Sequence, residues 1–220
     1  MANAIAQEHG YFASFMPKPF RDRTGSGAHF NISLADRKTA KNLFDDPSDP
    51  RGCGMSKLGY QFIAGVLRHA RAIAAVIAPT VNSYKRLVAR GSMSGFTWAP
   101  IFVCYGNNNR TNMLRIPMNG PRIECRAADM SCNVYLGAAM ILAAGLEGIK
   151  QDLDPGQPHR ENMYLSSPEM LASQNIALLP RTLGEAIDAF EADPLSEAVM
   201  GPLMYKTFIN FKRNEWMDYQ

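Results

Sequence analysis

The sequence predicts an α+β fold, and two patterns carry this prediction. Short β-biased segments are concentrated in the first 130 residues, and helical patterns lie around and after them. The chain has 220 residues, of which 46% are hydrophobic and 20% charged, as in ordinary globular proteins. We therefore expect a core of substantial size, with residues 1–220 belonging to one domain.

Five segments have the composition of β-strands and are bounded by turn residues. In chain order they are residues 11–19, 28–34, 98–106, 113–117 and 122–129. The first two flank a glycine loop, and polar or Gly- and Pro-containing turns separate the last three. Because no helical pattern lies between those three, we expect antiparallel strands rather than parallel βαβ units.

Helical spacing predicts the elements that cover the sheet. In chain order the patterns lie at residues 2–6, 58–77, 134–149, after Thr182 and at 202–220. Apolar residues recur on one face of 58–77, and 134–149 is apolar on nearly all sides, so these two helices should be the most buried, with Phe62, Ile141 and Leu142 inside. Thr182 and Glu185 stand in capping-box register at the start of the later helix.

Three segments are expected to be loops. Residues 45–54 are polar and should lie on the surface, as should residues 154–168. Residues 82–87 carry no clear periodicity and lead into 89–95, which is rich in small residues. Loops of that composition move or bind ligands.

Charge and cysteine usage exclude several classes of protein. The chain carries 23 Lys and Arg against 20 Asp and Glu, and because the basic residues are scattered we expect no nucleic-acid partner. Its four cysteines lack the spacing of a structural zinc site, which favours a reduced, cytoplasmic protein. No signal-peptide pattern and no run of about 18 apolar residues is present, so we expect neither a targeting segment nor a membrane partner.

Arginine is the residue type that stands out. Four arginines, at positions 110, 115, 122 and 126, lie within 17 residues. Arg122, Glu124 and Arg126 alternate and so share one face of a strand. This face could be a solvated strand edge with paired charges. It could equally be a site for a phosphate or carboxylate ligand, with Glu124 binding a divalent cation that accompanies the phosphate. His29 could likewise be a hydrogen-bonded structural residue or a metal ligand.

Several motifs together resemble the C-terminal catalytic domain of the glutamine synthetase family. They follow the family's order and approximate spacing over nearly the whole chain: FMPKP at 15–19, GSGAHFNIS at 25–33, APTVNSYKRLV at 78–88, NRTNMLRIP at 109–117, RIECRA at 122–127 and NVYLGAAMILAAGLEGIK at 133–150. The resemblance implies the fold of glutamine synthetase and guanido kinase catalytic domains. There, an antiparallel sheet forms part of an active-site barrel, with helices packed around it.

The resemblance also implies an ATP-dependent ligase. Such an enzyme phosphorylates the γ-carboxylate of glutamate, and ammonia or an amine then displaces phosphate. His29 and Glu124 would be ligands of Mg²⁺ or Mn²⁺. The residues that would hold ATP phosphates and the charge developing in transfer are Arg110, Arg115 and Arg122, of which Arg110 would also be catalytic. The remaining site residues would be Gly25, Arg86 and Arg126 for glutamate and its acyl phosphate, and Asn31 and Ser33 in the nucleotide cleft.

Three positions depart from the family's pattern. Asn31 replaces a common histidine, and the stretch that leads into Arg122 lacks an often-present lysine, so one cationic phosphate contact is missing. Trp98 stands just before an Ala-Pro pair, where ammonia-using members carry a glutamate. An indole cannot take a proton from ammonium, but its face can hold an alkylammonium ion by a cation–π contact. An amine is therefore a candidate nucleophile beside ammonia.

Tyr164 lies in an Asn-Met-Tyr stretch comparable in place to the motif that is adenylylated in some bacterial members. Because the residues that follow differ, we favour an exposed loop tyrosine without a special role over a modified one.

The resemblance implies further parts outside these residues. Family members carry an N-terminal β-grasp domain and additional glutamate metal ligands before FMPKP. Two ligands alone do not meet the octahedral preference of Mg²⁺, so we expect a piece of a longer enzyme, inactive by itself, that works in a homo-oligomeric ring of subunits. The alternative is a non-catalytic relative that keeps the fold as a structural or binding module. Retention of His29, Glu124 and the motif arginines favours the enzyme, since a scaffold does not need these charges.

Overall fold

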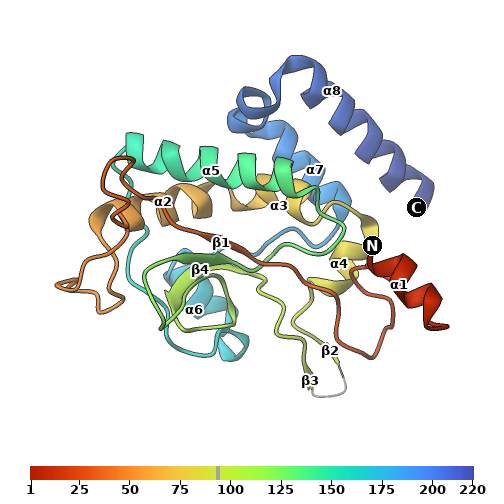
Figure 1. The fold of residues 1–220 in the computed structure, drawn as a ribbon, viewed down its shortest axis with the longest axis horizontal. Coiled ribbons are helices and arrows are strands. Elements are labelled where there is room, and N and C mark those ends of the chain that lie inside the picture. The colour runs from red at the N-terminus through yellow and green to blue at the C-terminus, as the bar shows by residue number, and fades with distance from the viewer. Residues whose placement is uncertain (93–94) are drawn as a thin grey trace.

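Four short strands form the central sheet in the computed structural model, which describes residues 1–92 and 95–220. The strands are β1 (Phe30–Ile32), β4 (Phe102–Asn107), β5 (Asn112–Ile116) and β6 (Ile123–Cys125). Their order is β1-β6-β5-β4, and the sheet does not close into a barrel within the described residues. Helices lie along one face of this sheet (Figure 1), so the predicted α+β class is confirmed.

The prediction of a fully antiparallel sheet is wrong for one pair of strands. β6 pairs antiparallel with both β1 and β5, whereas β4 and β5 are parallel, with Phe102 opposite Asn112. Asn108 has a left-handed φ of 51°, and the Asn109 side chain accepts a hydrogen bond from the Thr111 N–H at 3.0 Å. The short connection therefore coils back to the start of β4 instead of forming a hairpin.

Residues 11–19, predicted as a strand, pair with no strand in the described part of the chain. Pro17 and Pro19 have no N–H to donate to a ladder. The segment is held instead by single contacts: the Lys18 N–H donates to Asn82 Oδ1 at 2.6 Å, and the Pro17 carbonyl accepts from the Ser26 N–H at 2.8 Å. The next predicted segment, residues 28–34, does contain a strand, β1.

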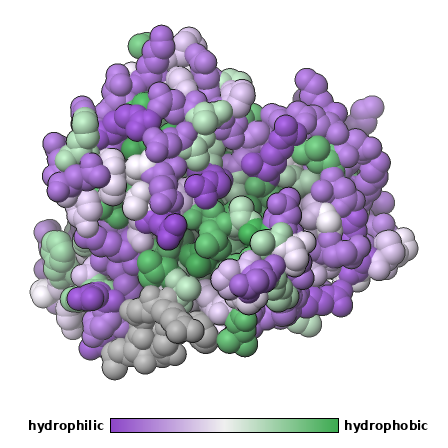
Figure 2. All heavy atoms as spheres, turned by 180° about the vertical axis from the view of Figure 1, so that it is seen from behind, coloured by the Kyte–Doolittle hydropathy of each residue, from purple (hydrophilic) through white to green (hydrophobic). Residues whose placement is uncertain are grey.

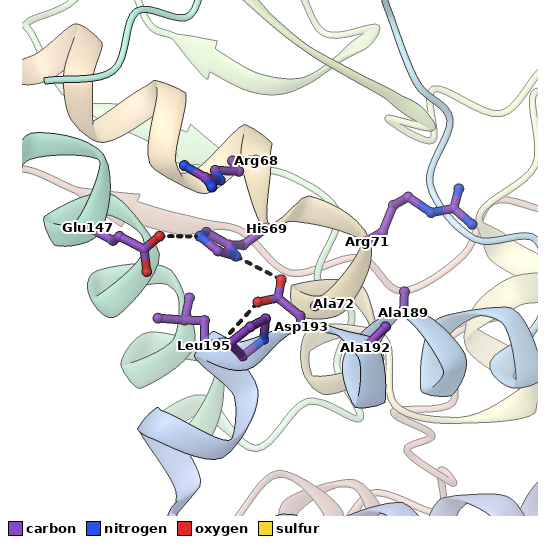
Figure 3. Close-up of a pocket in the computed structure, with 10 residues that line it drawn as sticks. Arg68, His69, Arg71, Ala72, Glu147, Ala189, Ala192, Asp193 and Leu195 are labelled. Atoms are coloured by element: carbon purple, nitrogen blue, oxygen red, sulfur yellow. Dashed lines mark hydrogen bonds and ion pairs between the residues drawn. The ribbon is translucent and has the colours of Figure 1, made fainter. Parts of the chain in front are cut away.

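The helix predicted over residues 58–77 is two helices, α2 (Lys57–Arg68) and α3 (Ala70–Ile77). They meet at His69, whose side chain lies between two carboxylates, Asp193 at 2.7 Å and Glu147 at 3.3 Å (Figure 3). Nothing in the local sequence breaks the helical pattern here. The break accompanies these contacts with side chains distant in the sequence.

The second long helix is α5 (Val134–Lys150), which packs against α2. Phe62 and Ile141 are fully buried, as predicted, but Leu142 is 42% exposed. The prediction of a helix buried on nearly all sides is therefore wrong for one face of α5. That face carries the exposed side chains Val134, Tyr135, Leu142 and Leu146.

A short helix, α4 (Val81–Arg86), occupies the segment expected to be a loop. It is capped by Thr80, whose hydroxyl accepts from the Ser83 N–H, while Ser83 accepts from the Thr80 N–H. Six residues are too few for a periodic pattern to show. After it, β2 (Arg90–Ser92) and β3 (Gly95–Phe96) form a two-stranded sheet where a flexible segment was expected, and positions 93 and 94 of that segment lie outside the described residues.

The remaining helices are α1 (Ala2–Glu8), α6 (Pro168–Ser173), α7 (Leu183–Ala192) and α8 (Pro194–Tyr219), with a 3₁₀ turn at Met163–Leu165. Thr182 caps α7 as predicted, because its hydroxyl accepts from the Glu185 N–H at 3.1 Å. α8 kinks at Gly201, which has a φ of 71° and precedes Pro202.

The surface is mostly hydrophilic. Figure 2 shows this on the face opposite the view of Figure 1, where apolar residues gather mainly in a central hollow. None of the helices in the described residues is long and apolar enough to cross a membrane.

Candidate active site

Glu124, on β6, is the centre of a cluster of charged side chains from neighbouring strands. It is 7% exposed. Its Oε1 lies 2.7 Å from His29 Nδ1 and 3.2 Å from Arg126 Nη1, and its Oε2 lies 2.7 Å from Arg115 Nη1. The sheet register causes this meeting, because Asn31 of β1 and Arg115 of β5 are the partners of Glu124 on its two sides. Residues paired across strands present side chains on the same face.

The cluster holds Glu124 as a carboxylate. Burial by itself raises the pKa of Glu124, but the hydrogen bond from Arg115 and the charge of Arg126 outweigh it and lower the pKa. Burial and the charge of Arg126 lower the pKa of His29, against the effect of Glu124. A neutral imidazole next to an ionised carboxylate is a suitable ligand pair for a divalent cation.

His29 and Glu124 fit two adjacent positions of a metal site. Two ligands at right angles, each about 2.1 Å from a cation, have donor atoms about 3.0 Å apart, and the observed separation is 2.7 Å. Among the described residues no group of three or more His, Cys, Asp or Glu side chains could hold a metal ion. A cation held by this pair would need further ligands from outside the described residues.

The arginines around this cluster retain donors for an anion. The Nε atoms of Arg86, Arg115 and Arg126 are buried and have no hydrogen-bond partner within the described residues. Buried polar atoms are nearly always paired in native proteins. Guanidinium groups suit phosphate and carboxylate oxygens, so these arginines are candidates for binding an anion.

Arg122 and Asn31 form a second contact on the same sheet. Arg122 Nε donates to Asn31 Oδ1 at 3.0 Å. Ser33 follows two residues after Asn31 and is exposed. Alternation along the extended chain places His29, Asn31 and Ser33 on one side of it, so the resemblance-derived nucleotide residues lie next to the Glu124 cluster.

Arg86, on α4, reaches the site from behind the glycine loop. It is 8% exposed, and its Nη2 donates to the carbonyl oxygens of Ala127 and Ala128. A side chain at Gly25 would lie 2.5 Å from the Pro17 carbonyl and 2.8 Å from Arg86 Cγ. Only glycine allows the loop to approach Arg86 this closely.

Arg110 is separate from the direct contacts of Glu124. It is exposed on the connection between β4 and β5 and lines a surface cavity of about 380 Å³. The other residues around this cavity are Trp98, Asn107, Asn108, Asn109, Thr111, Arg160 and Asn162. Burial lowers the pKa of Arg126, and the charges of Arg115 and Arg110 add to this effect. Arg110 is thus close enough to act on the cluster electrostatically.

Two side chains of the site were missed by sequence reasoning. Asn108 accepts a hydrogen bond from Arg115 Nη2 at 2.5 Å. The second is Asp129, which is 1% exposed. Burial lowers the pKa of Arg86, and the charge of Asp129 acts in the opposite direction. The run of three asparagines at 107–109 signals a special turn, but which side chain that turn orients toward Arg115 depends on the parallel pairing of β4 and β5.

Tyr164 is not the exposed loop tyrosine that we expected. It is 9% exposed, its hydroxyl donates to the Ala99 carbonyl at 2.5 Å, and its ring packs against Phe102 at 5.8 Å between centroids. The 3₁₀ turn Met163–Leu165 directs the ring inward. Burial raises the pKa of the phenol to about 12, and a buried, hydrogen-bonded hydroxyl is poorly placed for adenylylation.

The fold and this cluster define an α+β domain whose sheet gathers cations suited to phosphate and carboxylate groups, around a carboxylate–imidazole pair suited to a divalent cation. Residues 1–220 match the family model described as the glutamine synthetase catalytic domain, and the chain belongs to this family.

Two curated relatives and one solved structure illustrate the similarity. The chain is 47% identical over 218 residues to the glutamate–methylamine ligase of Methyloversatilis universalis, which covers 99% of the chain and 48% of that protein. It is 41% identical over 222 residues to the glutamine synthetase of Pyrococcus horikoshii, covering 100% of the chain and 47% of that protein. A solved structure described as a GmaS/ADP complex superposes with a TM-score of 0.86 at 42% identity, over 99% of the chain and 48% of that structure. The chain thus spans about half the length of the relatives it matches.

Proposed function

We propose that the chain is the catalytic part of an ATP-dependent ligase that joins glutamate to a small amine, with ammonia as the alternative nucleophile. In this reaction a γ-carboxylate oxygen of glutamate attacks the γ-phosphorus of ATP and releases ADP. The amine nitrogen then attacks the acyl carbon, phosphate leaves, and the nitrogen loses a proton to give the γ-glutamylamide. The complete enzyme is proposed to work as a homo-oligomer.

The observation that carries this proposal is the Glu124 carboxylate held between His29, Arg115 and Arg126 at 2.7 to 3.2 Å. Phosphoryl transfer needs positioning and charge stabilisation more than covalent chemistry. We assign Arg110, Arg115 and Arg122 to ATP phosphates, and Asn31 and Ser33 to the nucleotide cleft. A Mg²⁺ or Mn²⁺ ion held by His29 and Glu124 would neutralise charge on the transferring phosphate.

The proposed glutamate site lies next to Arg86 and Arg126. Two guanidinium groups bind carboxylate and acyl-phosphate oxygens in bidentate geometry. The Gly25 loop, which can approach Arg86 only because it lacks a side chain, would bring backbone groups to the substrate. The unpaired Nε atoms of both arginines support this assignment.

Trp98 supports an amine as nucleophile. It is 53% exposed and lines the same cavity as Arg110. An indole face attracts an alkylammonium ion and buries its methyl group, whereas it cannot take a proton as a carboxylate can. The similarity to a glutamate–methylamine ligase agrees with this choice, and the similarity to glutamine synthetases keeps ammonia as the second candidate.

The test is a product assay on the complete enzyme with glutamate, ATP and either methylamine or ammonium. We expect phosphate release and γ-glutamylmethylamide formation, with kcat/KM for methylamine above that for ammonium. Trp98→Glu should shift the ratio toward ammonium by at least about tenfold, since one methyl group in an apolar pocket is worth about 10- to 200-fold. Trp216→Phe, at the other tryptophan of the chain, should leave the ratio unchanged.

A native preference for ammonium, or a ratio that Trp98→Glu does not move, would exclude the amine assignment. Absence of glutamate-dependent ADP formation with either nucleophile would favour a non-catalytic relative.

A further inference from the structure

Trp98 has an unusual backbone conformation. Its φ is 57°, in the left-handed region, which bulky side chains rarely adopt and which persists only where surrounding contacts enforce it. The residue is also 53% exposed, so burial of its own indole does not account for the conformation. Contacts made by its neighbours must hold it.

The residues on both sides of Trp98 are fixed by hydrogen bonds. The Thr97 hydroxyl donates to the Val88 carbonyl and accepts from the Ala99 N–H at 3.2 Å. The Ala99 carbonyl accepts from the Tyr164 hydroxyl at 2.5 Å. The Tyr164 ring also meets the Trp98 indole edge-on, with centroids 6.5 Å apart and planes at 73°. Tyr164 therefore contacts both the indole and the backbone carbonyl of the next residue, Ala99.

Tyr164 is itself anchored in a rigid part of the molecule. It belongs to a small apolar cluster, separate from the main core, that consists of Phe102, Cys104, Met163, Tyr164 and Ile176. Phe102 and Cys104 are part of β4, and the Phe102 ring packs edge-on against Tyr164. Side chains of a packed cluster are confined to few rotamers. The position of the Trp98 indole is thus tied to the sheet.

A cavity lies beside Trp98, and the position of the indole affects what this cavity can bind. Arg110 and Arg160 line it, and its described lining residues include no Asp or Glu. An alkylammonium ion that enters here meets two like charges. The indole face is the strongest attractive feature for an organic cation in this lining, and a cation–π contact depends on where the ring lies.

We infer that Tyr164 is a positioning residue that fixes the Trp98 indole at the entrance for the amine, and so sets the affinity of the enzyme for alkylammonium substrates. This inference rests on the proposed function, because it concerns the amine site of that reaction. Tyr164 acts through Trp98 and is not expected to touch the reacting atoms.

The experiment uses Tyr164→Leu and Tyr164→Phe in the complete enzyme. Leucine removes the ring contact and the hydroxyl, and KM for methylamine should rise about three- to tenfold, the factor that one aromatic contact carries. Phenylalanine keeps the ring against Trp98, and KM should rise about two- to threefold. KM for glutamate and for ATP should stay within about twofold in both variants, since a positioning effect is confined to the amine step. If Tyr164→Leu does not fold, Tyr164→Phe still provides this test.

Tyr205→Leu is the matched control. The Tyr205 ring also packs on an aromatic ring, Phe190, at 5.7 Å, and its hydroxyl also donates to a backbone carbonyl, that of Glu191, at 2.8 Å. It lies on α8 and is not among the described residues that line the cavity beside Trp98. This variant should lower stability without changing the KM for methylamine relative to glutamate.

A second measurement does not require activity. Acrylamide quenching is compared between each variant and its Trp98→Phe counterpart, so that the difference reports Trp98 alone. Tyr164→Leu should raise the Trp98 quenching constant by about twofold, because release from the ring opens the indole to solvent.

The quenching constant and the KM for methylamine together distinguish failure of the positioning role from failure of the proposed function. An unchanged quenching constant together with an unchanged KM for methylamine would overturn the positioning role and leave the proposed function intact. A raised quenching constant in an enzyme that prefers ammonium would retain the role of Tyr164 and exclude the amine site.

Discussion

Glu124 shows how one carboxylate can organise a site. Its two oxygens contact three side chains within 3.2 Å, and they pair with the buried Arg126 and the partly buried Arg115. Arg115 is in turn fixed on its other side by Asn108 at 2.5 Å. Removing the charge of Glu124 therefore leaves two guanidinium groups without a counter-charge, which is costly in a partly desolvated position.

We predict that Glu124→Gln lowers both stability and activity. The loss of unfolding free energy should be about 1–3 kcal/mol, the effect of leaving buried donors unpaired, and kcat should fall by at least about 100-fold because charge placement at the transferring phosphate is disturbed. Urea unfolding and ADP release measure the two effects. Glu161→Gln is the control, since Glu161 also pairs with a histidine, His159 at 3.0 Å, but on an exposed loop. Equal losses in the two variants would contradict the prediction.

Helices α2 and α5 are held together by glycines at their contact. A side chain at Gly65 would overlap the carbonyl oxygen of Ala144 and lie 2.8 Å from the backbone nitrogen of Gly148. A side chain at Gly148 would overlap the carbonyl oxygen of Gln61. The two backbones can approach this closely only where no Cβ intervenes. This packing places α5 over the core and leaves its opposite face exposed.

We predict that Gly65→Ala destabilises the domain by about 1–3 kcal/mol, the usual effect of overpacking, although alanine favours a helix more than glycine does. Backbone atoms oppose the added methyl group, so the helices must separate. Gly59→Ala in the same helix meets mainly the flexible side chain of Met55 and should cost less. Thermal unfolding of both variants tests this. A Gly65→Ala protein as stable as Gly59→Ala would show that α2 and α5 can separate freely.

His69 joins the helical layer into one unit. It lies at the junction of α2 and α3, contacts Glu147 of α5, and contacts Asp193 where α7 meets α8 (Figure 3). Burial alone lowers the pKa of His69, but the two carboxylates outweigh it and raise the pKa. Burial likewise raises the pKa of Asp193, but the bond to His69 outweighs it and lowers that pKa.

We predict a pH-dependent contribution of His69 to stability. Because its folded-state pKa is raised, the contribution is complete below about pH 6.5, the pKa of an unperturbed histidine, and is lost as the pH rises through the folded-state pKa. The lowered pKa of Asp193 keeps its part of the contact present above about pH 4. His69→Gln should therefore lose the most stability near pH 5–6 and less near pH 9, with a difference on the order of 1 kcal/mol.

Urea unfolding at the two pH values measures this difference, with His9→Gln, at an exposed position after α1, as the control. A loss that is independent of pH would contradict the assigned charge state of His69.

The sequence by itself determined the fold class and most of the strands and helices, and its resemblance to a family supplied the candidate site residues. The elements depend on local patterns, such as the capping residue Thr182 and the apolar periodicity of residues 58–77. A run of motifs in family order also identified the family, since that order needs no knowledge of contacts.

Only the tertiary structure decided how these parts meet. The parallel pairing of β4 and β5, the break at His69, the exposed face of α5 and the inward turn of Tyr164 each depend on residues distant in the sequence. Local propensity says nothing of those partners. The distances around Glu124 belong here as well, because they follow from the register of three strands. The sequence determines which side chains are available, and tertiary packing determines where they lie. Burial and pairing contribute more free energy than the local conformational preferences of single residues.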